Sequence, residues 1–146
     1  MLTVWSLVRF LHVLGAVLWV GGQLTVSALV RPVARRRLGE EQRAARMRSL
    51  GMRLGIVTVV AFIPLQVTTG VLLAAHKGVT IASLAEPGYG RMLAGKLTAF
   101  VLVMLAAALH GRANGAGRRT LARALAVSTL VGSVGVVLLA TALPTT

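Results

Sequence analysis

The first apolar run of the chain carries ionisable side chains, which are costly inside a bilayer and therefore indicate a functional site. At about 100° per residue, one face of a helix here would carry His12, Gly15, Trp19 and Gly22. Arg9 lies about one turn before His12. Imidazole can ligate a metal, a nearby arginine can neutralise an anion, and glycines let a flat group approach the backbone. Alternatively, His12 hydrogen-bonds a neighbouring helix and the glycines only allow close packing.

Composition indicates an integral membrane protein. The 146 residues are 56% hydrophobic and 13% charged, with a mean hydropathy of +0.82. The absence of cysteine excludes disulfides, thiolate metal sites and a thiol nucleophile. The net charge of +13 comes from basic residues that cluster between apolar runs. This placement favours cytoplasmic loops beside anionic lipid, with no nucleic-acid partner.

Four apolar runs predict one all-α membrane domain over residues 1–146, a bundle of four transmembrane helices. The predicted spans cover about 3–30, 54–75, 92–111 and 121–143. Arg31-Pro32 is expected to close the first helix, and Glu40 to begin the second. The arginines gather between the first two and between the last two spans. Basic loops stay cytoplasmic, so both termini are expected outside, in the inner cell membrane.

Helix rise decides which polar groups can meet. At about 1.5 Å per residue, the second span reaches the depth of His12 near Thr69, whereas His76 lies at the outer boundary. Arg9 and Lys96 lie about one turn inside that boundary. Cations without buried carboxylates predict an anionic ligand in the outer half of the bundle. Pro64 predicts a kink whose freed carbonyls need polar partners.

Haem b satisfies this pattern, because its iron takes neutral imidazole and its propionates need cations near the membrane surface. His12 would be an axial ligand, with Arg9 and Lys96 beside the propionates. Gly15 and Gly22 would make room for the ring on the face that also carries Trp19. The sixth iron position stays open between His76 with an inclined ring, Lys96, the His12 of a second protomer in a homodimer, and no ligand at all.

Several short strings also resemble one known family. They are Leu11-His12, Leu18-Trp19-Val20-Gly21-Gly22, Thr69-Gly70, Tyr89-Gly90-Arg91-Met92-Leu93-Ala94-Gly95-Lys96-Leu97 and Leu138-Leu139-Ala140-Thr141-Ala142-Leu143-Pro144. Together they resemble the copper-resistance D (CopD-like) superfamily, which includes the HemJ type of protoporphyrinogen oxidase. The resemblance covers most of the chain.

The two branches of that superfamily imply different functions. The HemJ branch implies haem b on a first-helix histidine and an important lysine in a later helix, roles that fall on His12 and Lys96. The chain departs from the HemJ pattern after the tryptophan, at 23–32, and in the last helix. The copper branch implies copper movement, with His12, His76 and Met92 as an outer capture site. No soft-ligand relay crosses the chain.

Conventional catalytic constellations are absent from the sequence: it has no paired carboxylates, nucleophile–base pair or phosphate-binding loop. Any oxidoreductase chemistry would therefore belong to a cofactor. Three functions remain. The first is a haem-b membrane protein in redox or electron transfer, with a quinone or membrane redox partner. The second is a copper-binding membrane protein, and the third is a structural four-helix bundle without a cofactor.

Overall fold

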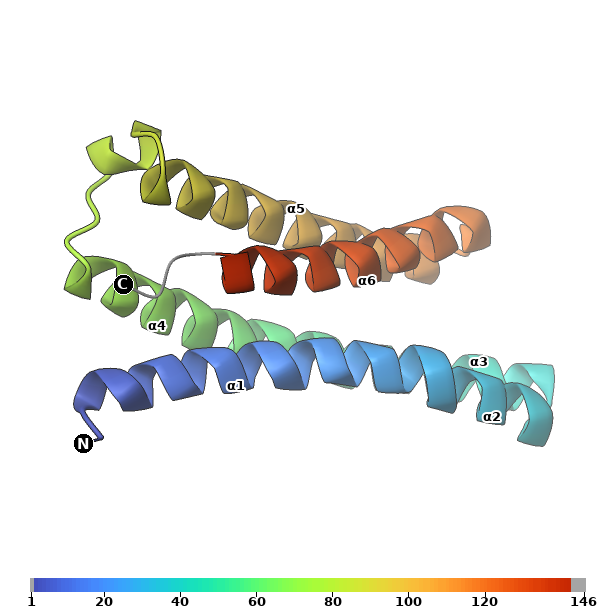
Figure 1. Cartoon of the computed structure of the whole chain (residues 1–146). Helices are drawn as coiled ribbons and strands as arrows, with labels where there is room; N and C mark the ends of the chain where they lie inside the picture. The colour runs from blue at the N-terminus through green and yellow to red at the C-terminus, as the bar shows by residue number, and fades with distance from the viewer. Residues whose placement is uncertain (1, 143–146) are drawn as a thin grey trace. The chain divides into compact units, whose positions relative to one another are not determined.

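A computed structural model of the chain describes residues 2–142 (Figure 1). Over this range every regular element is a helix, and four helical segments are long and apolar enough to cross a membrane. They are Val4–Arg37, Glu40–His76, Tyr89–Gly115 and Arg119–Thr141. The predicted all-α membrane class is confirmed at this level. The last predicted span ends at residue 143, which lies outside the described residues.

The chain divides into two compact units, Met1–Leu73 and Ala74–Thr146. The expectation that they form one four-helix domain stays a prediction. The first unit contains two helical rods joined by residues 38–39 (Figure 1). The first rod consists of α1 (Val4–Thr25), a π-helical turn (Val26–Val30) and α2 (Arg31–Arg37). The second consists of α3 (Glu40–Val57), a π-helical turn (Thr58–Phe62) and α4 (Ile63–His76), whose end crosses into the second unit.

Local chemistry explains where the rods begin. Thr3 caps α1 through a reciprocal pair of hydrogen bonds with Ser6. Gly39 precedes α3, whose first turn carries Glu40 and Glu41 at the positive end of the helix dipole. The predicted helix start at Glu40 is therefore confirmed.

The expectation that Arg31-Pro32 closes the first helix is wrong. Helical structure continues to Arg37, because a π-helical turn precedes the proline and Pro32 lies in the first turn of α2. Proline cannot donate a backbone hydrogen bond, and its ring clashes with the carbonyl four residues earlier. In the wider turn, the Arg31 N–H donates to the Val26 carbonyl.

A π-helical turn also precedes Pro64, in the second rod. The π-helical turn ends at Phe62, the Ile63 N–H donates to the Thr58 carbonyl, and Pro64 follows. The sequence predicts a kink at Pro64, and the structure has a π-helical turn just before this proline.

The second unit consists of a short 3₁₀ helix, η3 (Ala82–Ala85), and a hairpin of two long helices, α5 (Tyr89–Gly115) and α6 (Arg119–Ala142). Gly117, with φ of +72°, lies in the connection between them. Val103 packs at Gly132, where an added Cβ would lie 2.6 Å from the Val103 Cγ2 atom. A missing side chain on α6 thus admits a buried valine from α5.

Large apolar side chains are exposed on all four long helical segments, among them Leu18 (66%), Val60 (70%), Leu102 (60%) and Val131 (66%). A surface this apolar is typical of lipid contact and unusual for contact with water. Membrane residence follows from these surfaces and from helix length. The side of each loop and the identity of the membrane stay predictions.

Candidate functional site in the first unit

One face of α1 packs on one face of the second rod, and we call this contact the polar seam. Its residues are His12, Gly15 and Trp19 of the first rod, with Thr58, Phe62, Gln66, Thr69 and Gly70 of the second. Spacings of three and four residues on both rods bring these side chains onto facing surfaces. The predicted face of α1 is therefore the face that carries polar contacts between helices.

His12 is held by Thr69. The His12 Nδ1 and Thr69 Oγ1 atoms lie 2.7 Å apart. The Thr69 hydroxyl also lies 2.5 Å from the Leu65 carbonyl oxygen, which can only accept. The hydroxyl has only one hydrogen, so Thr69 donates it to the Leu65 carbonyl and accepts from His12. We therefore assign the ring hydrogen of His12 to Nδ1. In the neutral imidazole the lone pair is then on Nε2.

Trp19 and Thr58 repeat this arrangement further along the seam. The Trp19 Nε1–H donates to Thr58 Oγ1 at 3.3 Å, and the Thr58 hydroxyl donates to the Leu54 carbonyl at 2.8 Å. Indole nitrogen is only a donor, so here the direction of the bond is fixed. The Trp19 ring also stacks on Phe62, with centroids 4.9 Å apart and planes 6° from parallel.

Gly15 makes room for Gln66. A Cβ at Gly15 would lie 2.5 Å from the Gln66 Nε2 atom and 3.1 Å from Leu65 Cδ2. The same Nε2 atom donates to the backbone carbonyl of His12 at 2.7 Å. Gln66 is buried, and this bond satisfies its amide inside the seam. The space at Gly15, predicted for a cofactor ring, is thus filled by an amide side chain in this structure.

The remaining predicted site residues lie elsewhere. Arg9 is exposed on α1, one turn before His12. Lys96 lies on α5, and His76 is the last residue of α4, so both belong to the second unit. His76 follows Thr69 by seven residues, about 10 Å of helix rise. Thr69 is therefore the residue at the depth of His12, as predicted from sequence.

Ligand groups do not cluster in the described part of the chain. Over residues 2–142, no three histidine, aspartate or glutamate side chains are grouped so that they could hold a metal ion. The metal-binding roles of His12 and His76 stay predictions.

Three residues of the seam lie outside the predicted site set: Thr58, Phe62 and Gln66. The Gln66 amide donates across the seam to the His12 backbone carbonyl. Their spacing could have identified them from the sequence, because positions 58, 62, 66 and 69 follow one another at steps of four and three within one apolar run.

No family description, curated protein or solved structure matches the chain. The resemblance to the CopD-like superfamily therefore stays a prediction.

Proposed function

We propose that this chain is a haem-b-binding membrane protein with a redox or electron-transfer role, in which His12 Nε2 ligates the iron. The observation that carries the proposal is the hydrogen bond between His12 Nδ1 and Thr69 Oγ1 at 2.7 Å. Metal-ligating histidines almost always donate the N–H of their other ring nitrogen to an acceptor, which fixes the tautomer and the ring orientation. Thr69 supplies that acceptor, because its own hydrogen is directed at Leu65.

The residues of the seam can supply an iron ligand, but they leave little room for the haem macrocycle. His12 has the donor atom that haem iron takes, and the exposed Arg9 one turn away suits a propionate. Gly15 does not supply room for the macrocycle, because Gln66 occupies that space. The ring would therefore have to lie away from the Gly15–Gln66 contact. When bound, haem would supply one-electron chemistry, and the chain would hold a neutral, oriented imidazole.

The proposal includes the topology expected from the arginine clusters, with both termini outside, basic loops cytoplasmic and residence in the inner cell membrane. A quinone or another membrane protein would be the electron partner. Lys96 as a propionate partner or iron ligand, and a homodimer sharing two His12 side chains, belong to the same proposal.

A second candidate function is structural. Its support is the contact in which the Gln66 amide fills the space at Gly15 and bonds His12. Three side-chain hydrogen bonds and an aromatic stack hold the two rods together, and none of these contacts needs a cofactor. Copper on the His12 imidazole stays a further alternative, and the same experiment separates all three functions.

The test is an absorption spectrum of the purified protein, oxidised and dithionite-reduced, after expression with ample haem. We expect a Soret band and sharp reduced α and β bands, lost in His12→Ala. The matched control is His110→Ala, because His110 also bonds a neighbouring helix, through Nδ1 and the Ala122 carbonyl at 2.7 Å. Thr69→Val should retain the bands with haem affinity lower by about 10-fold or more.

A featureless spectrum contradicts haem binding. Copper bound in equal amount and lost in His12→Ala would then support the copper alternative. Absence of both cofactors would support the structural bundle. Bands that persist in His12→Ala and vanish in His110→Ala would place the iron ligand in the second unit and overturn the assignment of His12.

A further inference from the structure

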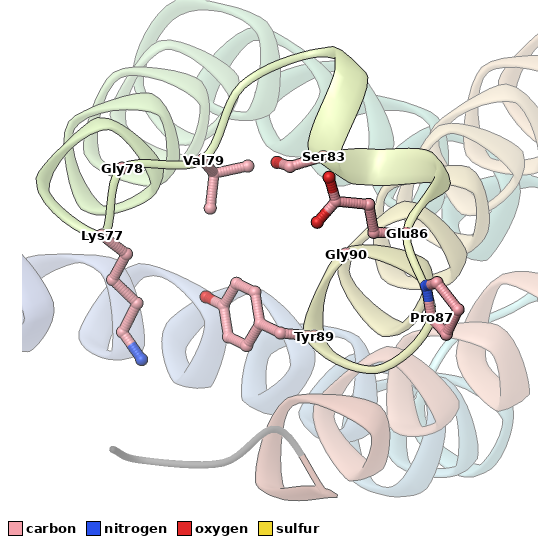
Figure 2. A pocket seen from close by; sticks show the side chains of 8 residues that line it. All are labelled: Lys77, Gly78, Val79, Ser83, Glu86, Pro87, Tyr89 and Gly90. Atoms are coloured by element: carbon pink, nitrogen blue, oxygen red, sulfur yellow. The ribbon is translucent and has the colours of Figure 1, made fainter.

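A small pocket with charged side chains in its walls lies in the second unit, in the segment between the end of α4 and the start of α5 (Figure 2). Its cavity is about 220 Å³, and its walls include Lys77, Val79, Ser83, Glu86, Tyr89 and Gly90. Two candidate membrane spans end and begin here, at His76 and Tyr89. The pocket therefore lies at the depth where a bilayer presents its headgroups.

The walls of the pocket are held by backbone geometry. Thr80 and Ser83 exchange two hydrogen bonds between backbone N–H groups and side-chain hydroxyls, at 3.0 and 3.2 Å. At Gly90 an added Cβ would overlap the Ser83 carbonyl oxygen, so only glycine lets α5 start against η3. The Arg91 N–H closes the loop on the Glu86 carbonyl at 3.1 Å. A site built in this way is largely formed before a ligand arrives.

Opposite charges line the pocket. The Lys77 ammonium lies 4.9 Å from the centroid of the Tyr89 ring, a cation–π contact that positions the positive charge. Figure 2 shows the Lys77 ammonium and the Glu86 carboxylate on different sides of that ring. Glu86 is exposed, and over residues 2–142 its carboxylate makes no ion pair or hydrogen bond with another side chain. The pocket thus separates an anion-binding side from an ammonium-binding side.

The start of α5 adds to the anion-binding side. Gly88 precedes this 27-residue helix without capping it by a side chain. The first N–H groups of a helix and its dipole favour a negative charge. The Arg91 and Met92 N–H groups already donate to the Glu86 and Gly88 carbonyls, so the donors at this helix start are the N–H groups of Tyr89 and Gly90. Together with Lys77 they suit a phosphate, while Glu86 suits a primary ammonium group.

We propose that this pocket binds the zwitterionic phosphoethanolamine headgroup of a membrane phospholipid. Phosphate would contact Lys77 and the start of α5, and the ammonium group would donate to Glu86. Position favours a lipid source, since the pocket lies where two apolar spans end. Its volume is below the roughly 300–1,000 Å³ of sites for drug-sized ligands, which suits a headgroup with its chains outside.

The chemistry separates phosphoethanolamine from related headgroups. Phosphocholine carries a quaternary ammonium without N–H donors, so it cannot donate a hydrogen bond to Glu86. Phosphoglycerol carries no cation and would leave Glu86 opposite a negatively charged ligand. This inference does not depend on haem or copper binding in the first unit.

The test offers the full chain, in detergent, an equal mixture of phosphatidylethanolamine, phosphatidylcholine and phosphatidylglycerol with identical acyl chains. Retained lipid is identified by native mass spectrometry. We expect phosphatidylethanolamine to be retained preferentially. Glu86→Gln should reduce its retention about tenfold, the effect of losing one charged hydrogen bond. Lys77→Gln should weaken retention of phosphatidylethanolamine and phosphatidylglycerol together. Glu41→Gln, on the first turn of α3, is the matched control and should change nothing.

Equal retention of the three lipids, or a preference that survives Glu86→Gln, would overturn the proposal. Preference for phosphatidylglycerol would show a plain anion site and remove the role of Glu86. Soluble phosphoethanolamine is the second arm. If it protects Glu86 from carbodiimide modification while the lipids do not, the occupant is a soluble zwitterion and the lipid assignment fails.

Discussion

In the first unit Thr69 accepts a hydrogen bond from His12 of the facing helix, whereas in the second unit Thr129 donates to Leu125 of its own helix. Both threonines are buried, at 5% and 6% exposure. Both also direct their hydroxyl hydrogen at the carbonyl four residues earlier. The difference lies in the partner helix, which brings a ring N–H to one hydroxyl and not to the other.

The two helix contacts consequently rest on different interactions. The polar seam uses donors on α1, namely His12 and Trp19, and acceptors on the second rod. The α5–α6 contact combines close packing, with Val103 at the space left by Gly132, and a hydrogen bond from His110 to the Ala122 carbonyl. In lipid, side-chain hydrogen bonds and small-residue packing are the two principal ways to hold helices together. The seam carries three such bonds, and the α5–α6 contact includes the bond from His110 Nδ1 to the Ala122 carbonyl, so each contact holds one imidazole in a fixed orientation.

The largest effect should come from filling the space at Gly132. Gly132→Ala places a methyl group 2.6 Å from Val103, a stiff β-branched side chain that is 5% exposed. Gly135→Ala on the same helix meets nothing within 4 Å, and it matches the change in helix propensity. We expect Gly132→Ala to lower the unfolding free energy by about 1–3 kcal/mol relative to Gly135→Ala. Unfolding by SDS in mixed micelles measures the difference. Equal stabilities would refute the packing account of the second unit.

A smaller effect is expected at Gly15, because the atom in the way is the end of a flexible side chain. Gly15→Ala would displace the Gln66 amide from the His12 carbonyl, at a cost of about 1 kcal/mol relative to the open Gly21→Ala control. In a Gln66→Ala background most of this cost should disappear, since the methyl group then enters vacated space. Additive effects in that double-mutant cycle would contradict the contact between Gly15 and Gln66.

Run length and hydropathy predict the number and class of the helices, because neither depends on which partner a helix packs against. The prediction at Pro32 is wrong because proline is common both just after the end of a helix and in the first turn of the next one. The residues around Pro32 do not show which of the two applies. The π-helical turn that joins α1 to α2 leaves no composition signal in residues 26–30.

The sequence predicts only part of the candidate site, because spacing and helix rise describe one helix at a time. Spacing alone placed His12, Gly15 and Trp19 on one face, and helix rise matched His12 to Thr69. Neither argument states which side chain of the partner helix enters the space beside a glycine. Gln66 fills it because its amide reaches the His12 carbonyl, and that fact requires both backbones in place.

The smallest effect separates the two threonines themselves. Thr69→Val removes the acceptor of His12 and should cost about 0.6 kcal/mol, with about 1.7 kcal/mol as the upper end for such bonds in membranes. Thr129→Val, equally buried, removes only a bond within its own helix and should cost less.

Nitrogen-15 chemical shifts of the His12 ring supply a readout that packing alone would not move. The unmodified protein should show the Nδ1–H tautomer, whereas Thr69→Val should show both tautomers, since a valine side chain accepts no hydrogen bond. An unchanged His12 spectrum in Thr69→Val would mean that another group orients the ring, and the argument for Nε2 as a ligand would then lose its basis.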